Sequence, residues 1–269
     1  MVYVRKASGE REAFDEKKVT HSIQRAGIPQ SLQTMVLSHV KSKLYTDIPT
    51  SEIYQHITEF LKSSQQPYTT AKYSLKQAIM ALGPTGHPFE DYIAAILQTQ
   101  GYITQTRVIV QGKCITHEID VIAERGNEKL MIETKFHNMP GTKTDSHVAL
   151  YTKARFDDIM TRNGFTKAWL VTNTKATIDA FTYGMCSTMH VVGWSLPEGE
   201  SLRDIVEKTK LLPVTALTSL SMEQQQKLLL NHTLLCQDIA KNPDVLYLLN
   251  LTPEKKKKVL EEVTYLIKP

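Results

Sequence analysis

The sequence predicts a multidomain α/β protein with a mostly helical front module, an α/β core and a helical C-terminal region. Three observations support this fold class. Residues 1–85 show a short β-hairpin pattern followed by amphipathic helix patterns. Residues 86–200 show a helix, three strands, a second helix and a further strand, an alternation typical of an α/β core. Residues 201–269 again show helix patterns.

The composition is compatible with a protein that binds nucleic acid. The 269 residues are 41% hydrophobic, which is enough for a core in each of two domains, and the net charge of +4 is mildly basic. No stretch approaches 18 apolar residues and no apolar leader opens the chain, so we expect a cytoplasmic protein without membrane contact. The three cysteines are odd in number and widely spaced, which favours a reducing compartment.

The front module is expected to open with two short strands that turn at Ser8 and Gly9. A helix follows, with Asp15 as its N-terminal cap and with Val19 and Ile23 on one face. Further helices are predicted over residues 32–45, 50–64 and 69–82. The segment GPTGHP, residues 83–88, holds two glycines and two prolines, and it predicts a linker that leaves the modules free to change orientation.

The core contains a strand, LMIETKF at residues 130–136, with two charged side chains in an apolar run. Side chains alternate across a strand, so Glu133 and Lys135 project from the same face, roughly 6 to 7 Å apart. Gly126 and Asn127 predict a tight turn just before this strand. The hairpin that results would bring Asp120, on the preceding strand, within reach of both.

Two carboxylates and an amine in one place suggest phosphodiester chemistry. Oxygen ligands from two carboxylates suit magnesium, which keeps waters and completes its shell with a phosphate oxygen. Lys135 could then orient or activate the attacking water, or neutralise charge that develops on the phosphorus centre. Two other interpretations stay open: a solvent-exposed ion pair between Glu133 and Lys135, and a structural adaptor in which the acids converge by coincidence.

The order of elements around this strand resembles a known family. FEDYIAAILQTQGY at 89–102, HEID at 117–120 and IETKFHN at 132–138 together resemble the Mrr-like branch of the PD-(D/E)XK nucleases, over roughly residues 86–200. The resemblance implies a restriction endonuclease-like αβββαβ core. It also implies that Asp120 and Glu133 bind magnesium and that Lys135 assists the water. Glu90 matches a helix acid that some members add to the site.

The sequence also departs from this family's pattern. Ile119 stands before Asp120 where a proline is usual, and His117 and Glu118 replace a glycine-rich approach, which leaves the role of these two residues open. Cys114, His117 and His137 could suggest zinc, but a fourth ligand and the spacing of a structural site are missing.

Two segments follow the Glu-x-Lys strand. The turn-rich loop NMPGTKTD, residues 138–145, is expected to overhang the site. The next helix carries Lys153 and Arg155, which are either surface charges or contacts to DNA phosphates.

The front module resembles the ATP-cone, a small nucleotide-binding regulatory domain found at the front of ribonucleotide reductases and of a zinc-ribbon repressor of their genes. The matched residues are Val4, Lys6, Gly9, Glu12, Phe14, Asp15, Lys18 and, in the last helix, Tyr73. The resemblance implies that ATP or dATP binds there, with Lys6 and Lys18 at the phosphates and Glu12 and Asp15 along the nucleotide's edge. No GxxxxGK[ST] loop is present, and the absence of a CxxC pair argues against the repressor itself.

The region after residue 200 carries the weakest signal. Its helices are expected to serve in docking or dimerisation. The run Lys255 to Lys258 either adds DNA affinity through counterion release or is a solvated helix face.

We therefore expect a magnesium-dependent DNA endonuclease of the restriction or defence type, regulated by ATP or dATP. The nucleotide would act through the 83–88 segment by shifting the chain between homo-oligomers. The alternative is a nucleotide-sensing DNA-binding regulator with an inactive nuclease core, which is weakened because Asp120, Glu133 and Lys135 are all present. The form of the DNA substrate, cleavage of RNA and any partner methyltransferase stay open.

Overall fold

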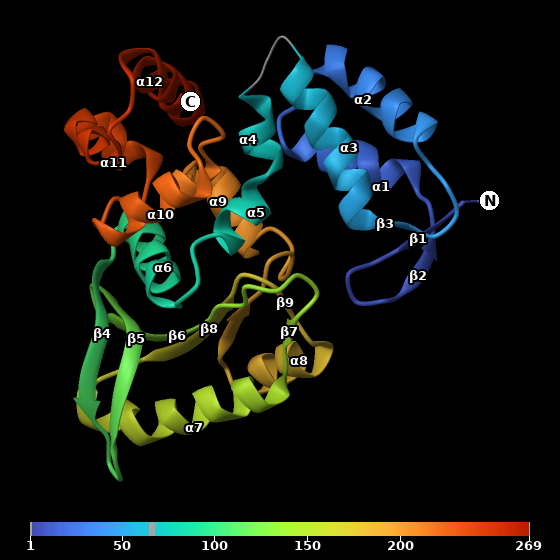
Figure 1. Cartoon of the computed structure of the whole chain (residues 1–269). Helices are drawn as coiled ribbons and strands as arrows, with labels where there is room; N and C mark the ends of the chain where they lie inside the picture. Colours follow the sequence, from blue (N-terminus) through green and yellow to red (C-terminus); the bar gives the residue numbers. More distant parts are fainter. Residues whose placement is uncertain (1, 65–67, 269) are drawn as a thin grey trace.

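The computed structural model describes residues 2–64 and 68–268, and it divides into a helical front module, a central sheet covered by helices, and a C-terminal group of helices (Figure 1). The mixed α/β class with a helical front and a helical C-terminal region is confirmed. In the described part of the chain, no helix is both long enough and apolar enough to cross a membrane.

The front module is a small three-stranded sheet with helices packed against it. Its elements are β1 (Tyr3–Arg5), β2 (Arg11–Ala13), α1 (Glu16–Arg25), α2 (Gln30–Ser42), β3 (Ile48–Pro49) and α3 (Thr50–Ser63). The strand order is β2-β1-β3, in which β1 and β2 form the expected hairpin and β3 pairs with β1 in parallel. Asp15 caps α1, as predicted, because its carboxylate accepts from the Lys17 N–H at 2.9 Å. Isoleucines of α1 and α3, including Ile23 and Ile57, form its core.

The single helix predicted over residues 69–82 is two short helices, α4 (Thr69–Tyr73) and α5 (Leu75–Met80). The chain turns between them at Ser74, whose hydroxyl accepts from the Tyr54 hydroxyl at 2.6 Å. This turn directs α5 away from the front module, and its apolar residues belong to the same hydrophobic cluster as the central and C-terminal regions.

The segment 83–88 is not the free linker that its composition predicts, because α5 before it and the helix after it belong to the same hydrophobic cluster. Leu82 is fully buried, and a Cβ at Gly83 would lie 2.9 Å from the Phe136 ring. His87 and Pro88 are already the first residues of the next helix. The glycines and prolines therefore turn the chain sharply against the core and do not separate two independent bodies.

The central sheet has five strands in the order β10-β8-β6-β5-β4. Its elements are α6 (His87–Thr99), β4 (Ile103–Gln111), β5 (Thr116–Arg125), β6 (Glu128–Lys135), α7 (Ser146–Asn163), β8 (Lys167–Thr172), α8 (Ile178–Cys186) and β10 (His190–Val192). Strands β4, β5 and β6 are antiparallel, whereas β6, β8 and β10 are parallel. Helix α6 covers one face and α7 and α8 cover the other (Figure 1). The predicted order of elements is therefore confirmed, and a short parallel pair, β7 (Lys143–Thr144) with β9 (Lys175–Ala176), was not predicted.

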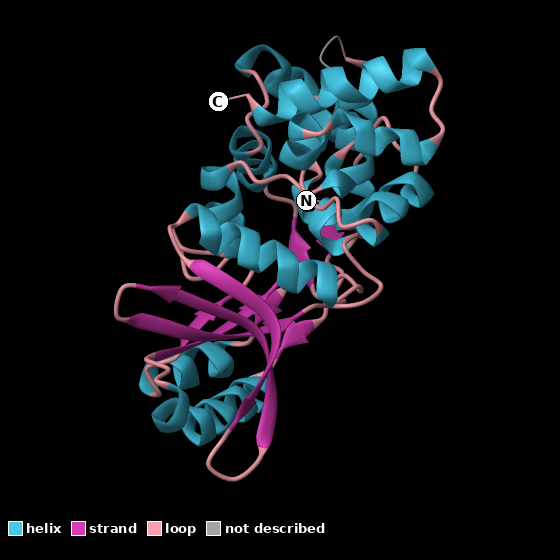
Figure 2. Cartoon of the chain, turned by 90° about the vertical axis from the view of Figure 1, so that its left-hand side faces the viewer, coloured by secondary structure: helices cyan, strands magenta, loops and turns pink. Residues whose placement is uncertain are grey.

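The β4–β5 hairpin extends past the helices that cover the sheet (Figure 2). Asp158, on α7, holds its tip: its carboxylate accepts from the Cys114 N–H at 2.8 Å and from the Ile115 N–H at 3.3 Å. The same carboxylate lies 2.8 Å from Nε2 of His117. These hydrogen bonds hold the pKa of Asp158 well below its usual range. The Cys114 backbone and the His117 ring are therefore held by Asp158 at the hairpin tip.

The C-terminal region is a packed part of the main core. Its elements are α9 (Leu202–Thr209), η1 (Val214–Ala216), α10 (Met222–Leu230), α11 (Cys236–Lys241), η2 (Pro243–Leu249) and α12 (Pro253–Ile267). Hydroxyl groups tie it to the rest of the chain, since Tyr92 donates to the Leu211 carbonyl and Thr215 to the Ala78 carbonyl, both at 2.6 Å. Glu262 is fully buried on α12 and accepts from backbone N–H groups of the α10 approach. The sequence did not predict α11 or η2.

Candidate active site

Asp120 lies where strands β5 and β6 diverge. The ladder between these strands ends at the pair Val121 and Ile132. The Thr134 N–H beyond that pair donates to the Asp120 carboxylate at 2.7 Å, and the Thr134 hydroxyl donates to the same oxygen at 3.2 Å. A side-chain carboxylate thus satisfies a backbone donor that a regular sheet would pair with a strand carbonyl. The aspartate is fixed in the gap between the two strands.

The divergence disrupts the side-chain alternation expected for β5. Val121 and Ala123 face the α6 side, as a period of two requires, but Ile119 packs on the α7 and α8 side together with Ile122. Ile119 therefore does not share a face with Val121, although a regular alternation would place both on the same side. The physical reason lies in the neighbouring strand, where Arg107 has a φ of 54° and the regular ladder skips the pair it would form with Asp120.

Glu133 projects from β6 toward α7, where Arg155 meets it. The Arg155 guanidinium donates to the Glu133 carboxylate and to the backbone carbonyl of Glu118 on β5. Both side chains are largely buried, with 9% of Arg155 and 15% of Glu133 exposed. Arg155 therefore joins the two strands from the helix side.

The electrostatics of the two carboxylates are coupled. Burial, followed by repulsion from Asp120, raises the pKa of Glu133 to about 7, against the opposing effect of Arg155 and Lys135. Burial also raises the pKa of Asp120, although the hydrogen bonds from Thr134 act in the other direction. Two carboxyl groups that resist ionisation because of burial, one of which is also repelled by the other, are typical of a site that gains a cation.

Glu90 lies in the first turn of α6 and is electrostatically close to Asp120. Its pKa is raised, first by burial and also by the charge of Asp120. Arg107 donates to Glu90 at 2.9 Å and to the adjacent Asp91 at 2.8 Å. The predicted helix acid is thus brought to the site, but a guanidinium already binds it. Sequence reasoning missed Arg107, for which the only available signal was a single charge in the middle of an otherwise uncharged strand.

Lys135 ends β6, on the same face as Glu133. It is exposed, and among the described residues its ammonium group has neither an ion pair nor a side-chain hydrogen bond. An amine that is free to reach a neighbouring phosphate or water suits the predicted role.

The donor set fits a hard divalent cation held partly by substrate. Among the described residues, no group of three or more His, Cys, Asp or Glu side chains is arranged to hold a metal. Two carboxylates, Asp120 and Glu133, can supply oxygen ligands. Magnesium is commonly bound by one or two carboxylates together with waters and phosphate oxygens, so a third protein ligand is not required.

The two basic residues predicted to contact DNA have different environments. Arg155 is buried and binds Glu133, so the predicted phosphate contact is a wrong assignment for this side chain. The error arose because a basic residue on a helix is by default a surface charge, whereas this one faces the sheet. Lys153 lies on the outer side, where it pairs with Asp157 across one turn. Its contact with DNA stays a prediction.

The loop after β6 touches the front module. The side-chain amide of Asn173 anchors its start: Nδ2 donates to the His137 carbonyl at 2.7 Å, and Oδ1 accepts from the His137 N–H at 2.8 Å. Further along, Gly141 has a φ of 89°, and a Cβ there would lie 3.0 Å from the carbonyl oxygen of Ala7. Ala7 belongs to the turn of the β1–β2 hairpin. The site loop and the front hairpin are therefore in direct contact.

The matched residues of the front module gather around one cavity of about 270 Å³. Its lining includes Val4, Glu12, Phe14, Asp15, Lys18 and Tyr73. Glu12 is central, because its carboxylate pairs with Lys6 at 2.8 Å and with Lys18 at 2.9 Å. These two lysines hold the pKa of Glu12 below its usual range. Gly9 occupies the hairpin turn with a φ of 84°.

Tyr73 and Tyr54 form one wall of this cavity. Their rings are stacked, with centroids 5.4 Å apart and an interplanar angle of 15°. Burial raises the pKa of Tyr73 to about 12. The cavity therefore combines an aromatic wall with Lys18, and Glu12 connects it to Lys6, which does not line the cavity itself.

Comparisons with known proteins agree with this division of the chain. Residues 2–79 match the ATP cone domain family, residues 83–194 match the Restriction endonuclease family, and residues 212–267 match the AF1548-like, C-terminal family. An uncharacterized protein of Archaeoglobus fulgidus is 38% identical over 176 residues, which make up 65% of this chain and 99% of that protein. The crystal structure of AF1548, a protein of unknown function, is 36% identical with a TM-score of 0.58 and covers 68% of this chain and 98% of that chain.

The fold and these matches define a restriction endonuclease-like protein with an ATP cone domain in front, and both parts of the predicted resemblance are confirmed. The chain belongs to the same family as the Archaeoglobus relative. At family level, its central domain is that of a nuclease-type hydrolase.

Proposed function

We propose that this protein is a magnesium-dependent DNA endonuclease whose activity depends on ATP or dATP bound to the front module. The observation that carries the proposal is the meeting of Asp120 and Glu133 at the gap between β5 and β6, with Lys135 exposed beside them. The family match to restriction endonucleases supports the reaction class.

Asp120 and Glu133 would hold the cation, which supplies a Lewis acid for the phosphate and a more acidic water when bound. Asp120 is oriented by Thr134, so its position does not depend on the ligand. Lys135 orients the attacking water or neutralises charge on the phosphate oxygens. Arg155 holds β5 and β6 together, and it compensates the negative charge of Glu133 when no cation is bound.

One observation favours the second candidate, a nucleotide-sensing DNA-binding regulator with an inactive core. Arg155 already occupies the Glu133 carboxylate, and an arginine there lowers the negative charge available to a cation. A cleavage assay separates the two candidates directly.

The test is cleavage of supercoiled, branched, modified and single-stranded DNA with magnesium. Asp120→Asn keeps an acceptor for Thr134, and we expect it to reduce cleavage by about 100-fold or more because it removes a charged ligand; Lys135→Ala should do the same. Glu124→Gln, which changes an exposed carboxylate at the other end of β5, is the matched control. Calcium in place of magnesium should permit DNA binding without efficient cleavage. Wild-type rates in Asp120→Asn and Lys135→Ala would exclude the assignment.

The nucleotide part of the proposal has a separate test. Lys18→Ala should weaken ATP or dATP binding by about tenfold, since it removes a charge-assisted contact to phosphate. Lys17→Ala is the control, because Lys17 is the adjacent exposed lysine and does not line the cavity. Calorimetry that detects no binding of any adenine nucleotide would remove the regulatory role and leave the nuclease proposal intact.

A further inference from the structure

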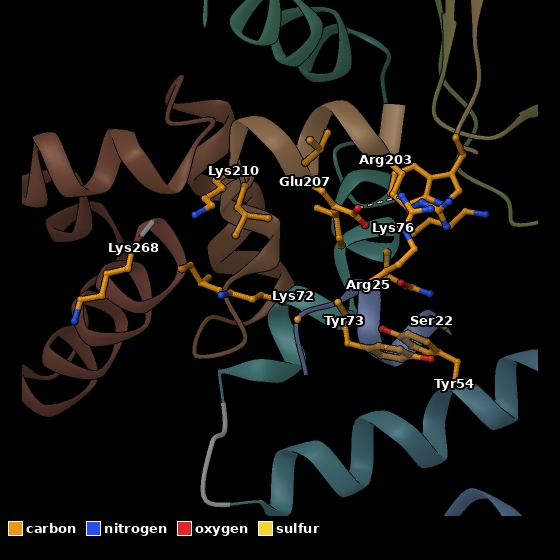
Figure 3. Close-up of a pocket in the computed structure, with 18 residues that line it drawn as sticks. Ser22, Arg25, Tyr54, Lys72, Tyr73, Lys76, Arg203, Glu207, Lys210 and Lys268 are labelled. Atoms are coloured by element: carbon orange, nitrogen blue, oxygen red, sulfur yellow. Dashed lines mark hydrogen bonds and ion pairs between the residues drawn. The ribbon is translucent and has the colours of Figure 1, made fainter. Parts of the chain in front are cut away.

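A second cavity, of about 340 Å³, lies where the front module meets the C-terminal part of the central domain (Figure 3). It is lined by side chains of α1, α4, α5 and α9, together with Trp194 and the end of α12. Its volume is in the range of small-molecule sites, roughly 300 to 1,000 Å³. It contains none of the proposed catalytic residues.

The lining carries a strong excess of positive charge. Its basic residues are Arg25, Lys72, Lys76, Arg203, Lys210 and Lys268, and its one acidic residue is Glu207. Figure 3 shows these side chains arriving from separate segments of the chain. Because their elements are far apart in sequence, the cluster is produced by the tertiary fold and not by one charged run.

The one acidic residue of the lining, Glu207, is already paired with an arginine. Arg25 donates to Glu207 at 3.2 Å and also to Asp204, so this arginine is neutralised. In the described part of the chain, the other five basic residues of the lining form no ion pair. Nε of Arg203 is buried and has no hydrogen-bond partner there. A buried N–H donor without an acceptor lowers the stability of the folded protein, and a bound anion that accepts from it would restore that stability.

Lys76 and Arg203 lie near each other on one side of the cavity (Figure 3). Lys76 is half-buried, with Nζ 5.9 Å from the centroid of the Trp194 ring. Burial lowers its pKa, as do the positive charges of Lys175 and Arg203. Burial, together with repulsion from Arg25, likewise lowers the pKa of Arg203. The protein holds like charges together here, an arrangement that a multivalent anion stabilises.

The shape and aromatic walls indicate the size of the ligand. Trp194 is only 8% exposed, and the stacked Tyr54 and Tyr73 also line the cavity. The same two tyrosines form a wall of the 270 Å³ nucleotide pocket. The two cavities are therefore neighbours that share a wall. The junction cavity is partly open, has three aromatic side chains in its lining, and is too small for a DNA duplex.

We propose that this junction cavity binds a small polyphosphorylated ligand of nucleotide size, with Lys76 and Arg203 as its principal phosphate contacts. The site is separate from the nucleotide pocket of the front module and does not depend on the proposed nuclease activity. A ligand bound between α1, α5 and α9 also stabilises the observed arrangement of the front module against the rest of the chain.

Trp194 lines this cavity, so its fluorescence can report binding in the full chain. The protein has two tryptophans, so Trp169→Phe leaves Trp194 as the only one. Titration of this variant with inorganic tripolyphosphate should give a saturable change in Trp194 emission. Adding Lys76→Met or Arg203→Met should weaken the binding by about tenfold or more, because each removes a charged hydrogen-bond donor. The exposed Lys210→Met, which poses little risk to folding, should weaken it about threefold.

Two control variants test whether tripolyphosphate binds in the junction cavity and not elsewhere on the protein. Lys208→Met changes an exposed lysine of α9 outside the cavity and should leave the titration unchanged. Lys18→Ala should also leave it unchanged while it weakens ATP binding in the front pocket. Thermal unfolding of the unmodified chain, which tripolyphosphate should shift upward, gives a measurement that needs no tryptophan variant.

The proposal is overturned if tripolyphosphate changes neither the Trp194 emission nor the unfolding temperature. It is equally overturned if Lys76→Met and Arg203→Met bind as the parent does. A response to duplex DNA without a response to tripolyphosphate would assign the surface to the DNA backbone instead.

Discussion

At the scale of single residues, charged side chains of the central domain are placed by partners on other elements. Arg155 reaches Glu133 from α7, and Arg107 reaches Glu90 from β4. In both cases a guanidinium compensates a largely buried carboxylate near Asp120. Removal of one partner should therefore leave a buried charge without compensation, which costs more than the pair itself contributes.

Arg155→Met should lower the free energy of unfolding by about 2 kcal/mol, below the 3 to 5 kcal/mol of a fully buried pair because Glu133 keeps 15% exposure. The double variant Arg155→Met with Glu133→Gln should recover most of this loss. Urea unfolding in metal-free buffer at pH 8 measures both. Lys153→Met on the same helix removes a surface pair with Asp157 and should cost less than about 1 kcal/mol. Equal losses for Arg155→Met and Lys153→Met would show that the inner pair has no special cost.

At the scale of elements, local signals predicted where helices and strands lie but not how they pack. The cap at Asp15, which was correctly predicted, and the left-handed Gly164 after α7 mark helix ends that local chemistry sets. The turn at Ser74 and the packing of residues 83–88 depend on Tyr54 and Phe136, which are distant in sequence. Composition alone therefore predicted a free linker at residues 83–88, where the chain makes a turn between two helices of one core.

The same distinction applies to the candidate site. Asp120, Glu133 and Lys135 could be predicted together because a hairpin and a period of two relate their positions. Arg107 and the inward direction of Arg155 could not, since they follow from the divergence of β5 and β6 and from the rotation of α7 against the sheet. The positions of both side chains therefore depend on tertiary contacts, which a local sequence pattern does not contain.

The loop after β6 is the element through which the front module could affect the site. Gly141→Ala introduces a Cβ that must move away from Ala7, so we expect the loop to separate from the front hairpin. Cleavage without nucleotide should stay within about threefold of wild type, whereas the effect of ATP on cleavage should be lost.

Gly199→Ala provides a matched control, since Gly199 has a φ of 81° and a Cβ there would meet nothing within 4 Å. Both substitutions should cost about 1 kcal/mol of stability from the positive φ, but only Gly141→Ala should uncouple the nucleotide. If Gly141→Ala retains the full ATP response, coupling does not pass through this contact.

At the scale of the whole molecule, ion pairs and a close backbone approach are among the contacts that join the front module to the rest of the chain. Arg25 of α1 binds Asp204 and Glu207 of α9, and Ala7 meets Gly141. A nucleotide in the front pocket can change activity only if two arrangements of these parts differ in their affinity for it. The contacts at the junction, and not residues 83–88, are where such arrangements would differ.

We predict that ATP and dATP, or tri- and diphosphates, shift the protein between oligomers that differ in cleavage rate. The reason is that a change at the junction alters which surfaces of the front module are free to meet a second copy, and a coupling of 1 to 3 kcal/mol is enough for a shift of about 5- to 150-fold. Sedimentation velocity with each nucleotide, run beside the cleavage assay, measures mass and rate under the same conditions. Lys18→Ala should shift both changes to about tenfold higher nucleotide concentration, and Arg25→Gln should alter them without weakening the front pocket itself. Unchanged mass and rate with every nucleotide, while calorimetry detects binding, would mean that the front module recognises a partner and does not act as a switch.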